Sequence, residues 1–254
     1  IMRRKEVKRT SLIIVSVLVL LSIALTACQP ASTKVRVATD ATFPPFETVD
    51  EATKELTGFD VELMNALAAK AGIEIEWVNI GFDPMLAGLS QCQYDVAIAA
   101  ITITEDRKKD MLFSEPYINA GQIISVNKSN TEISGPESLA GKKVGAQLGT
   151  TGAIEAEKIA GVELKTYDSY DLAFLDLANG QIDAVIADYP TALGFIGQNS
   201  DKLTTVGEVF TDESYGIAVC KKNTDLLKKI NDGLAAIKAD GTVQKLELKW
   251  LAGQ

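Results

Sequence analysis

Apolar and polar residues alternate along the chain with two different periods, and the period changes repeatedly after residue 34. Residues 35–38 (VRVA) have the pattern of a short strand, and residues 73–77 (IEIEW) alternate apolar with acidic side chains, which predicts a half-buried strand. Between them, apolar residues recur three and four positions apart. This spacing predicts an amphipathic helix that begins at Gly58 and ends at Gly72. Alternating strands and helices are typical of an α/β fold.

The same order returns in the second half of the chain. Residues 95–100 (DVAIAA) predict a buried strand that closes the first series. The second series comprises a strand at 143–148, a helix from Thr151, a strand near Leu164, a helix ending at Gly180 and a strand at 183–187. Two further helices, separated by Gly241, are predicted within residues 223–250. Two strand–helix series of similar size favour two lobes over a single sheet.

The predicted lobes are not separated by a Pro-rich linker, so we expect extended strands to join them near residues 121–122 and 213–216. This expectation gives lobe 1 residues 34–121 together with 213–254, and lobe 2 residues 122–212. A chain that crosses twice between lobes forms a cleft that opens and closes by hinging.

The first 28 residues have the layout of an export signal. Basic residues between positions 3 and 9 precede an apolar run at 12–25, and Thr26-Ala27-Cys28 follows. The run is shorter than the roughly 20 residues that span a bilayer, so we predict a signal peptide over residues 1–27. Leu25 to Cys28 also resembles the lipobox of bacterial lipoproteins. That resemblance implies a lipidated, palmitate-bearing Cys28 and a short tether at residues 28–33; ordinary cleavage is the alternative.

Composition excludes several functions. The formal net charge of -9 argues against nucleic acid as a partner, since phosphate binding needs clustered Lys and Arg. The sequence contains 0 His, which removes the usual general base and the commonest metal ligand, so we expect neither an enzyme nor a metal or other cofactor. Cys92 and Cys220 are interpreted as two buried thiols, with a disulfide as the alternative that the sequence leaves open.

Four local patterns at predicted strand ends suit a small zwitterion. Arg107, shortly after the DVAIAA strand, can bind a carboxylate with two parallel N–H···O bonds, or it is one charge on a solvated face. Residues 149–152 (GTTG) form either an anion site at a helix N-terminus or an ordinary capping turn. Asp188 can hold an ammonium group or cap the next helix. Phe43 and Phe82 enclose a ligand side chain or simply pack in the core.

Five segments carry a family resemblance. Residues 58–63 (GFDVEL), followed by Leu67 and Ala68, resemble the signature of the polar amino-acid family of extracellular solute-binding proteins. Residues 38–47, 101–117, 141–152 and 183–190 resemble the same family in its usual order and spacing. The resemblance implies a periplasmic-binding-protein-like α/β fold, with a ligand cleft between two lobes joined by two hinge strands.

The function that the resemblance implies is high-affinity capture of a free amino acid, polar or basic by preference, and its delivery to the membrane permease subunits of an ABC transporter. A monomer is expected, anchored by lipid to the outer face of the cell membrane, or periplasmic in a Gram-negative host.

The resemblance also implies roles for individual residues. Arg107 matches the arginine that binds the ligand α-carboxylate with help from Thr102 and Thr151, and Asp188 matches the acceptor of the α-ammonium, assisted by the Ala100 carbonyl. The remaining matches concern the ligand side chain: Phe43 and Phe82 enclose it, Asp40 meets a polar or cationic tip, and Gln147 occupies a position that varies with the ligand. Some glutamine-binding members carry His where this chain has Ala187, which weakens glutamine as the ligand.

Two rival functions share this fold. A cyclohexadienyl dehydratase-like enzyme needs a general acid in the cleft, for which Asp188 or Glu47 is available, and turnover of arogenate or prephenate would identify it. A free-standing amino-acid sensor needs no transporter, and a neighbouring permease gene would argue against it.

Overall fold

The computed structural model describes residues 34–252. The predicted signal peptide, Cys28 and the tether lie outside the described residues. Within residues 34–252, no helix combines the length and the apolar character needed to cross a membrane.

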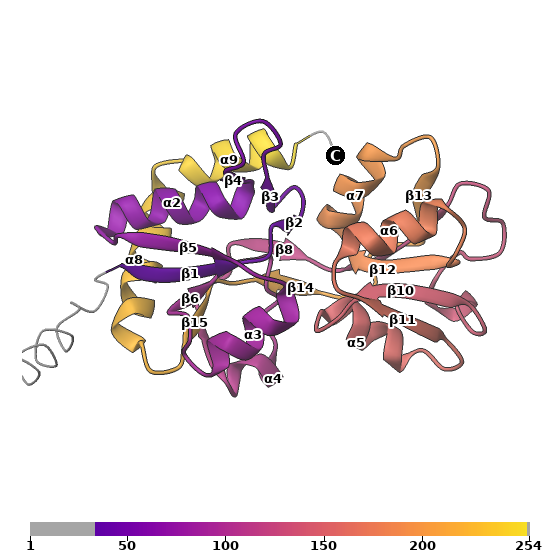
Figure 1. The fold of residues 1–254 in the computed structure, drawn as a ribbon, viewed down its shortest axis with the longest axis horizontal. Helices are drawn as coiled ribbons and strands as arrows, with labels where there is room; N and C mark the ends of the chain where they lie inside the picture. Colours follow the sequence, from indigo (N-terminus) through magenta and orange to yellow (C-terminus); the bar gives the residue numbers. More distant parts are fainter. Residues whose placement is uncertain (1–33, 253–254) are drawn as a thin grey trace, which may run out of the picture. The chain divides into compact units, whose positions relative to one another are not determined.

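Lobe 1 is built on a mixed five-stranded sheet, drawn from both ends of the described chain (Figure 1). Its strands lie in the order β5 (Ile75–Asn79), β1 (Val35–Thr39), β6 (Val96–Ala97), β15 (Ala218–Cys220) and β7 (Met111–Phe113). β1 pairs in parallel with β5 and β6, whereas β15 is antiparallel to β6 and β7. Val37 and Ala38 pack into different clusters of core residues, so this sheet is buried on both faces.

Helices cover both faces of this sheet. α2 (Phe59–Ala71), α8 (Thr224–Ala239) and α9 (Thr242–Trp250) pack together on one face, and α3 (Phe82–Ser90) packs on the other. Gly72 ends α2 in the left-handed conformation, with φ of 64°, as the sequence predicts. A short helix, α4 (Glu105–Lys108), and a small sheet of β2 (Thr42–Phe43), β3 (Glu47–Val49) and β4 (Leu56–Thr57) complete the lobe.

Lobe 2 is a second α/β/α sandwich. Its strands lie in the order β11 (Glu163–Tyr167), β10 (Lys143–Gln147), β12 (Ala184–Asp188), β9 (Gln122–Asn127) and β13 (Leu203–Val206). Helix α5 (Thr151–Lys158) covers one face, and α6 (Tyr170–Ala178) and α7 (Tyr189–Gln198) cover the other. A 3-10 turn, η1 (Pro136–Ser138), precedes β10.

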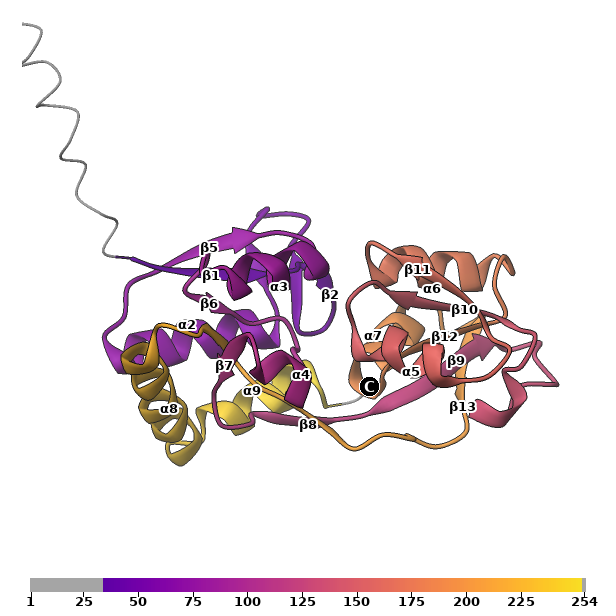
Figure 2. The ribbon, with the colours of Figure 1, turned by 90° about the horizontal axis from the view of Figure 1, so that it is seen from below.

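Two antiparallel strands run between the sheets, as Figure 2 shows from below. They are β8 (Ile118–Ala120) and β14 (Glu213–Tyr215), which pair with Glu213 opposite Ala120. The α/β class and the two-lobed arrangement predicted from the sequence are confirmed.

Two local predictions are wrong. Of the predicted strand at 95–100, only Val96–Ala97 pairs as β6, and Ala100 has a left-handed φ of 47°, outside the extended region. The position of Phe82 after the strand predicted at 73–77 favours a strand-end loop, but Phe82 is the first residue of α3.

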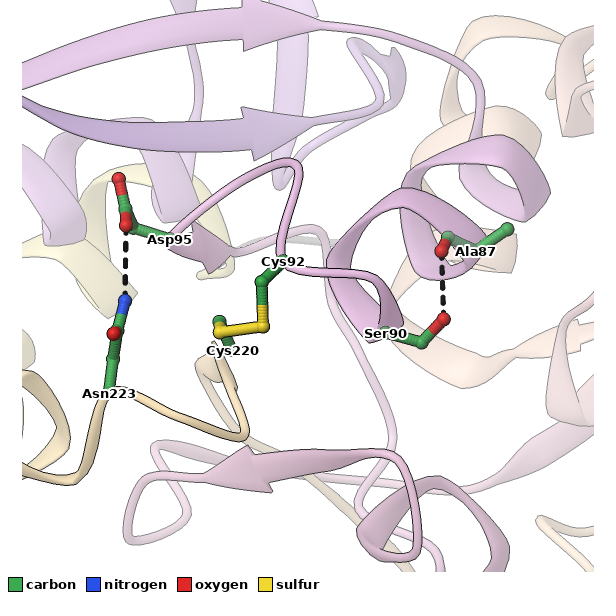
Figure 3. The surroundings of a disulfide bond; sticks show 6 residues. All are labelled: Ala87, Ser90, Cys92, Asp95, Cys220 and Asn223. Carbon is green, nitrogen blue, oxygen red and sulfur yellow. Dashed lines mark hydrogen bonds between the residues drawn. A yellow bond between two sulfur atoms is a disulfide. The ribbon is translucent and has the colours of Figure 1, made fainter.

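The interpretation of Cys92 and Cys220 as two thiols is also wrong. They form a disulfide with Cα atoms 5.1 Å apart, which joins the turn after α3 to β15 (Figure 3). A hydrogen bond of 3.1 Å from Asn223 to Asp95 lies close by. Sequence spacing gave no sign of the pairing because the cysteines are 128 positions apart and meet only through the sheet.

Candidate functional site

The carboxyl ends of β1, β6, β10 and β12 converge on a small cavity between the lobes. Its volume is about 10 Å³, close to the space of one water molecule. The cavity is lined by Phe43, Phe82, Ala100, Thr102, Arg107, Thr150, Thr151 and Asp188. A larger solute therefore reaches these side chains only when the lobes move apart. Strand ends are where open α/β sheets place their ligands.

Arg107 is held by a short helix and spans the lobes. The Thr104 hydroxyl caps α4 by accepting from the Arg107 backbone N–H at 3.1 Å. The Arg107 guanidinium donates to the Thr102 carbonyl at 2.8 Å on its own lobe and to the Gly149 carbonyl at 2.9 Å on lobe 2. Burial lowers the pKa of Arg107 to about 10, while Asp188 and Glu213 oppose that shift, so it is a cation at neutral pH. Its remaining N–H groups are available for a carboxylate.

Thr151 is the first residue of helix α5, and residues 148–150 separate it from the end of strand β10. The Thr150 hydroxyl caps that helix, accepting from the Ala153 backbone N–H at 3.3 Å. The GTTG segment is therefore a capping turn and also part of the cavity wall. The Thr151 and Thr102 hydroxyl oxygens lie 3.2 Å apart across the lobes.

Asp188 ends strand β12 and is buried. It makes no side-chain cap for α7, so the capping alternative does not describe it. Burial, then repulsion from Glu213, raises the pKa of Asp188 to about 7. A buried carboxylate of this kind gains most from a cation placed beside it.

Asp40 and Gln147 meet across the cleft. The Gln147 side-chain amide donates to Asp40 Oδ2 at 2.8 Å. The same carboxylate accepts from the Phe82 backbone N–H at 3.1 Å and from the Thr42 hydroxyl at 2.9 Å. Burial nevertheless raises the pKa of Asp40.

The aromatic pair serves both the core and the cavity. The Phe43 ring contacts Tyr170 of lobe 2, with ring centroids 5.5 Å apart. The Phe82 ring lies under the Arg107 guanidinium, 5.4 Å from its centroid, which is a cation–π contact. Packing and ligand enclosure are thus compatible for these two residues.

Ala100 is fixed by an acid from the signature segment. Asp60 Oδ2 accepts from the Ala100 backbone N–H and from the Tyr117 hydroxyl, each at 2.7 Å. Buried Glu47 lies beside Asp60; burial and repulsion from Asp60 raise the pKa of Glu47 well above its usual range. Because donors stabilise the Asp60 anion, Glu47 is the member of the pair that holds a proton.

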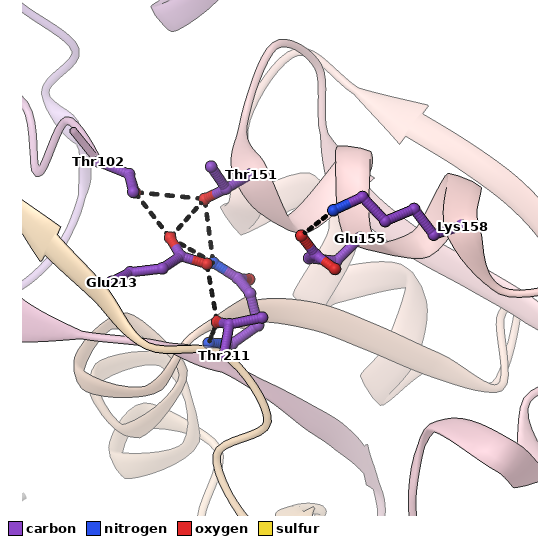
Figure 4. Close-up of polar contacts among 7 residues, drawn as sticks. Thr102, Thr151, Glu155, Lys158, Thr211 and Glu213 are labelled. Atoms are coloured by element: carbon purple, nitrogen blue, oxygen red, sulfur yellow. Dashed lines mark hydrogen bonds and ion pairs between the residues drawn. The ribbon is translucent and has the colours of Figure 1, made fainter. Parts of the chain in front are cut away.

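Sequence reasoning missed two polar residues of this site, the half-buried Glu213 and the buried Gln122. Glu213 Oε2, on hinge strand β14, accepts from the Thr102 and Thr151 hydroxyls, both at 2.9 Å (Figure 4). The Gln122 side-chain amide, on β9, reaches Thr151 and Asp188, each at 3.1 Å. The signal that the sequence offered was an acidic residue, Glu213, in a predicted hinge strand. The direction in which its side chain points depends on hydrogen-bond partners more than 60 positions away in the chain.

Two other features of the described residues do not compete with this site. A larger groove of about 860 Å³ lies between α7, β8 and α9. It shares no lining residue with the cavity, although Tyr189 of the groove follows Asp188 of the cavity in sequence. Residues 34–252 contain no cluster of Cys, Asp or Glu arranged to hold a metal ion.

The fold and the site define a two-lobed, hinged solute-binding protein. The chain belongs to the bacterial extracellular solute-binding proteins, family 3, whose profile matches residues 35–253. The L-cystine-binding protein TcyJ of Escherichia coli K12 is 39% identical over 216 residues, which are 84% of this chain and 81% of that protein. The ABC transporter arginine-binding protein 1 of the same organism is 36% identical over 226 residues, 87% of this chain and 91% of that protein.

A solved structure agrees with this assignment. An ancestral arginine-binding protein bound to arginine superimposes with a TM-score of 0.83 at 45% identity, covering 87% of this chain and 99% of that one. These relatives are named as amino-acid-binding proteins: one for L-cystine, one for arginine in an ABC transporter, and one for arginine with arginine bound.

Proposed function

We propose that this protein captures a free amino acid, polar or basic, and delivers it to the permease of an ABC importer. The observation that carries the proposal is the gathering of Arg107, Asp188 and the Phe43–Phe82 pair around one cavity. Arg107 binds the α-carboxylate, Asp188 the α-ammonium, and the rings enclose the side chain. Ala100, Thr102 and Thr151 complete the contacts with the common α-amino-acid group.

Basic amino acids are favoured, with L-arginine first. The supporting observation is the buried Asp40 carboxylate, whose partner from lobe 2 is the neutral amide of Gln147. A guanidinium or ammonium tip placed there would pair with a carboxylate that burial otherwise penalises. The arginine-binding names among the relatives agree with this choice.

Capture proceeds by hinging about β8 and β14. The amino acid enters while the lobes are apart, and closure brings Thr151 and Asp188 of lobe 2 onto it. The cross-lobe bonds from Arg107 to Gly149 and from Gln147 to Asp40 then form. The lobes divide at residues 121/122 and 212/213.

A binding role is favoured over the dehydratase-like alternative. Glu47, one of the two acids available for such an enzyme, is buried beside Asp60 and does not line the cavity. Turnover of prephenate or arogenate by the purified protein would contradict this part of the proposal.

Export and anchoring are proposed from residues 1–28: a cleaved signal peptide, and a lipid on Cys28 that holds the protein at the outer face of the membrane. The disulfide supports an oxidising compartment. A monomer that binds no nucleic acid is expected. Cys28→Ser should release the protein from the membrane fraction.

The test is a thermal-shift screen of the common amino acids and L-cystine, followed by calorimetry. L-arginine should raise Tm and bind with a Kd in the micromolar range or tighter, which is a binding free energy of about -8 kcal/mol or more negative. Arg107→Ala should abolish binding while the variant still unfolds cooperatively. Near-normal affinity in Arg107→Ala would overturn the carboxylate assignment, and no binding of any amino acid would overturn the function.

A further inference from the structure

The carboxylate of Glu213 lies where hinge strand β14 meets both lobes (Figure 4). Its Oε2 accepts from Thr102 of lobe 1 and from Thr151 of lobe 2, each at 2.9 Å. Its Oε1 accepts from the Thr211 hydroxyl at 2.8 Å and from the Gln122 amide at 3.2 Å. Each of these described partners is a donor, so protein groups alone fill the acceptor positions of the carboxylate.

This arrangement fixes the threonine protons. A hydroxyl carries one proton, and a bond to a carboxylate is charge-assisted and stronger than a bond between two hydroxyls. The two bonds to Glu213 are 2.9 Å long, whereas the hydroxyl oxygens of Thr102 and Thr151 are 3.2 Å apart. Both protons therefore point to Glu213, and both oxygens turn only lone pairs toward the cavity that these residues line.

The same side of the cavity is rich in other acceptors. Asp188 lines it, and its Oδ1 receives one N–H from Gln122 at 3.1 Å. The Gln122 amide nitrogen has two protons but lies within 3.2 Å of acceptors on Thr151, Asp188 and Glu213. What this group of oxygens lacks is donors, and an ammonium group supplies three.

We propose that Glu213 is a positioning residue, which directs the Thr102 and Thr151 hydroxyl protons away from the cavity and so makes this side selective for the ligand α-ammonium. The proposal rests on the proposed function and refines it. The two hydroxyls serve the ammonium, and the α-carboxylate is left to Arg107 and backbone N–H groups. Because the hydroxyls come from opposite lobes, the ammonium pocket is complete only when the cleft is closed.

The decisive variant is Glu213→Gln, which keeps the shape of the side chain but replaces one acceptor oxygen with an N–H donor. The Thr102 and Thr151 protons are then free to turn into the cavity. Glu155→Gln is the matched control, since Glu155 lies on α5 close to the same network and pairs instead with Lys158 at 2.6 Å (Figure 4).

Three probes separate the two ends of the amino acid. L-arginine has both groups, 5-guanidinopentanoic acid lacks the α-ammonium, and agmatine lacks the α-carboxylate. For a protein that binds L-cystine instead, 3,3′-dithiodipropionic acid and cystamine are the corresponding probes. Affinities are measured by calorimetry at pH 8, for the wild type and both variants.

Glu213→Gln should reduce the preference for L-arginine over 5-guanidinopentanoic acid by about tenfold or more, and change the preference over agmatine by less than about threefold. Glu155→Gln should leave both preferences as in the wild type. Equal loss of both preferences in Glu213→Gln would mean a merely structural role and would overturn the proposal, as would no change in either.

A second variant covers the case in which Glu213→Gln does not fold. Thr102→Val removes one hydroxyl at nearly constant shape and should lower the preference over the ammonium-free probe only. If Thr102→Val instead lowered only the preference for L-arginine over the carboxylate-free probe, the proposal would be overturned, while amino-acid binding itself would stand. If the wild type binds no amino acid, the proposed function fails first, and this inference fails with it.

Discussion

Gln147 of lobe 2 donates its side-chain amide to Asp40 of lobe 1 across 2.8 Å. Both residues are buried, and burial raises the pKa of Asp40. The contact joins the two lobes next to Phe82, whose backbone N–H also donates to Asp40, although neither Asp40 nor Gln147 lines the cavity.

Asp40→Asn tests this contact as a determinant of specificity. Removing the charge of Asp40 should lower the affinity for L-arginine and L-lysine by about tenfold to a hundredfold, since hydrogen bonds to charged groups contribute about 1.5–3 kcal/mol. The affinity for neutral amino acids should fall much less. Asp83→Asn, an exposed acid on α3 near Gly149, is the control for charge alone. Equal weakening of cationic and neutral ligands by Asp40→Asn would argue against this role.

Binding should depend on pH through Asp188. Its pKa of about 7 means that the carboxyl group is largely protonated below that pH, whereas an ammonium ligand requires the anion. Binding therefore releases a proton below pH 7, and affinity for L-arginine should fall up to about tenfold per pH unit there, with a plateau above. Calorimetry in two buffers of different ionisation enthalpy measures the release. Constant affinity from pH 5.5 to 7 would refute the assignment.

Glu47 should make the protein less stable as pH rises. A carboxyl group whose pKa is raised on folding binds more protons in the folded state than in the unfolded state, from the ordinary pKa upward. Wild-type stability should therefore fall from about pH 4.5 toward neutrality, by up to about 1.4 kcal/mol per unit for this one group.

Glu47→Gln removes this contribution to the pH dependence of stability. The Tm of the variant should therefore rise relative to that of the wild type as pH rises. Thermal unfolding between pH 4.5 and 7.5 measures the difference, with exposed Glu51→Gln as the control. A constant Tm difference across the range would contradict the buried-proton account.

The disulfide should contribute to stability but not to affinity. Cys92 and Cys220 do not line the cavity, and both belong to lobe 1. Replacing both with Ser should lower the free energy of unfolding by about 2–5 kcal/mol while L-arginine affinity changes little. Denaturant titrations give the first quantity and calorimetry the second. Free thiols in the unreduced protein, detected by alkylation and mass spectrometry, would rule the bond out.

Sequence periodicity was sufficient for the longer helices and for the two lobes, because each amphipathic stripe is a local signal, but it did not predict α3 or α4. The helix predicted from Gly58 to Gly72 is α2, and the two helices predicted within residues 223–250 are α8 and α9, which pack on the same core. The segment at 95–100 failed because its conformation depends on a hydrogen bond from Ala100 to Asp60, 40 positions earlier. No local pattern carries that information.

For the candidate site too, local sequence patterns identified some residues, whereas others depend on contacts that are distant in sequence. Arg107 and Asp188 were found as charges at strand ends, and the resemblance decided between exposed and binding roles. Glu213 was missed because its partners Thr102 and Thr151 lie 111 and 62 positions away. Only the folded hinge brings the three together.

Strand β15 lies between β6 and β7, although it is made more than 100 residues after both. The first lobe to be synthesised is thus the last to be completed, since its sheet has a gap until the chain has passed residue 217. Lobe 2, whose strands are continuous in sequence from 122 to 206, is complete before then. A nascent chain would carry a finished lobe 2 beside an open, aggregation-prone sheet, and truncation before β15 should leave lobe 1 unfolded.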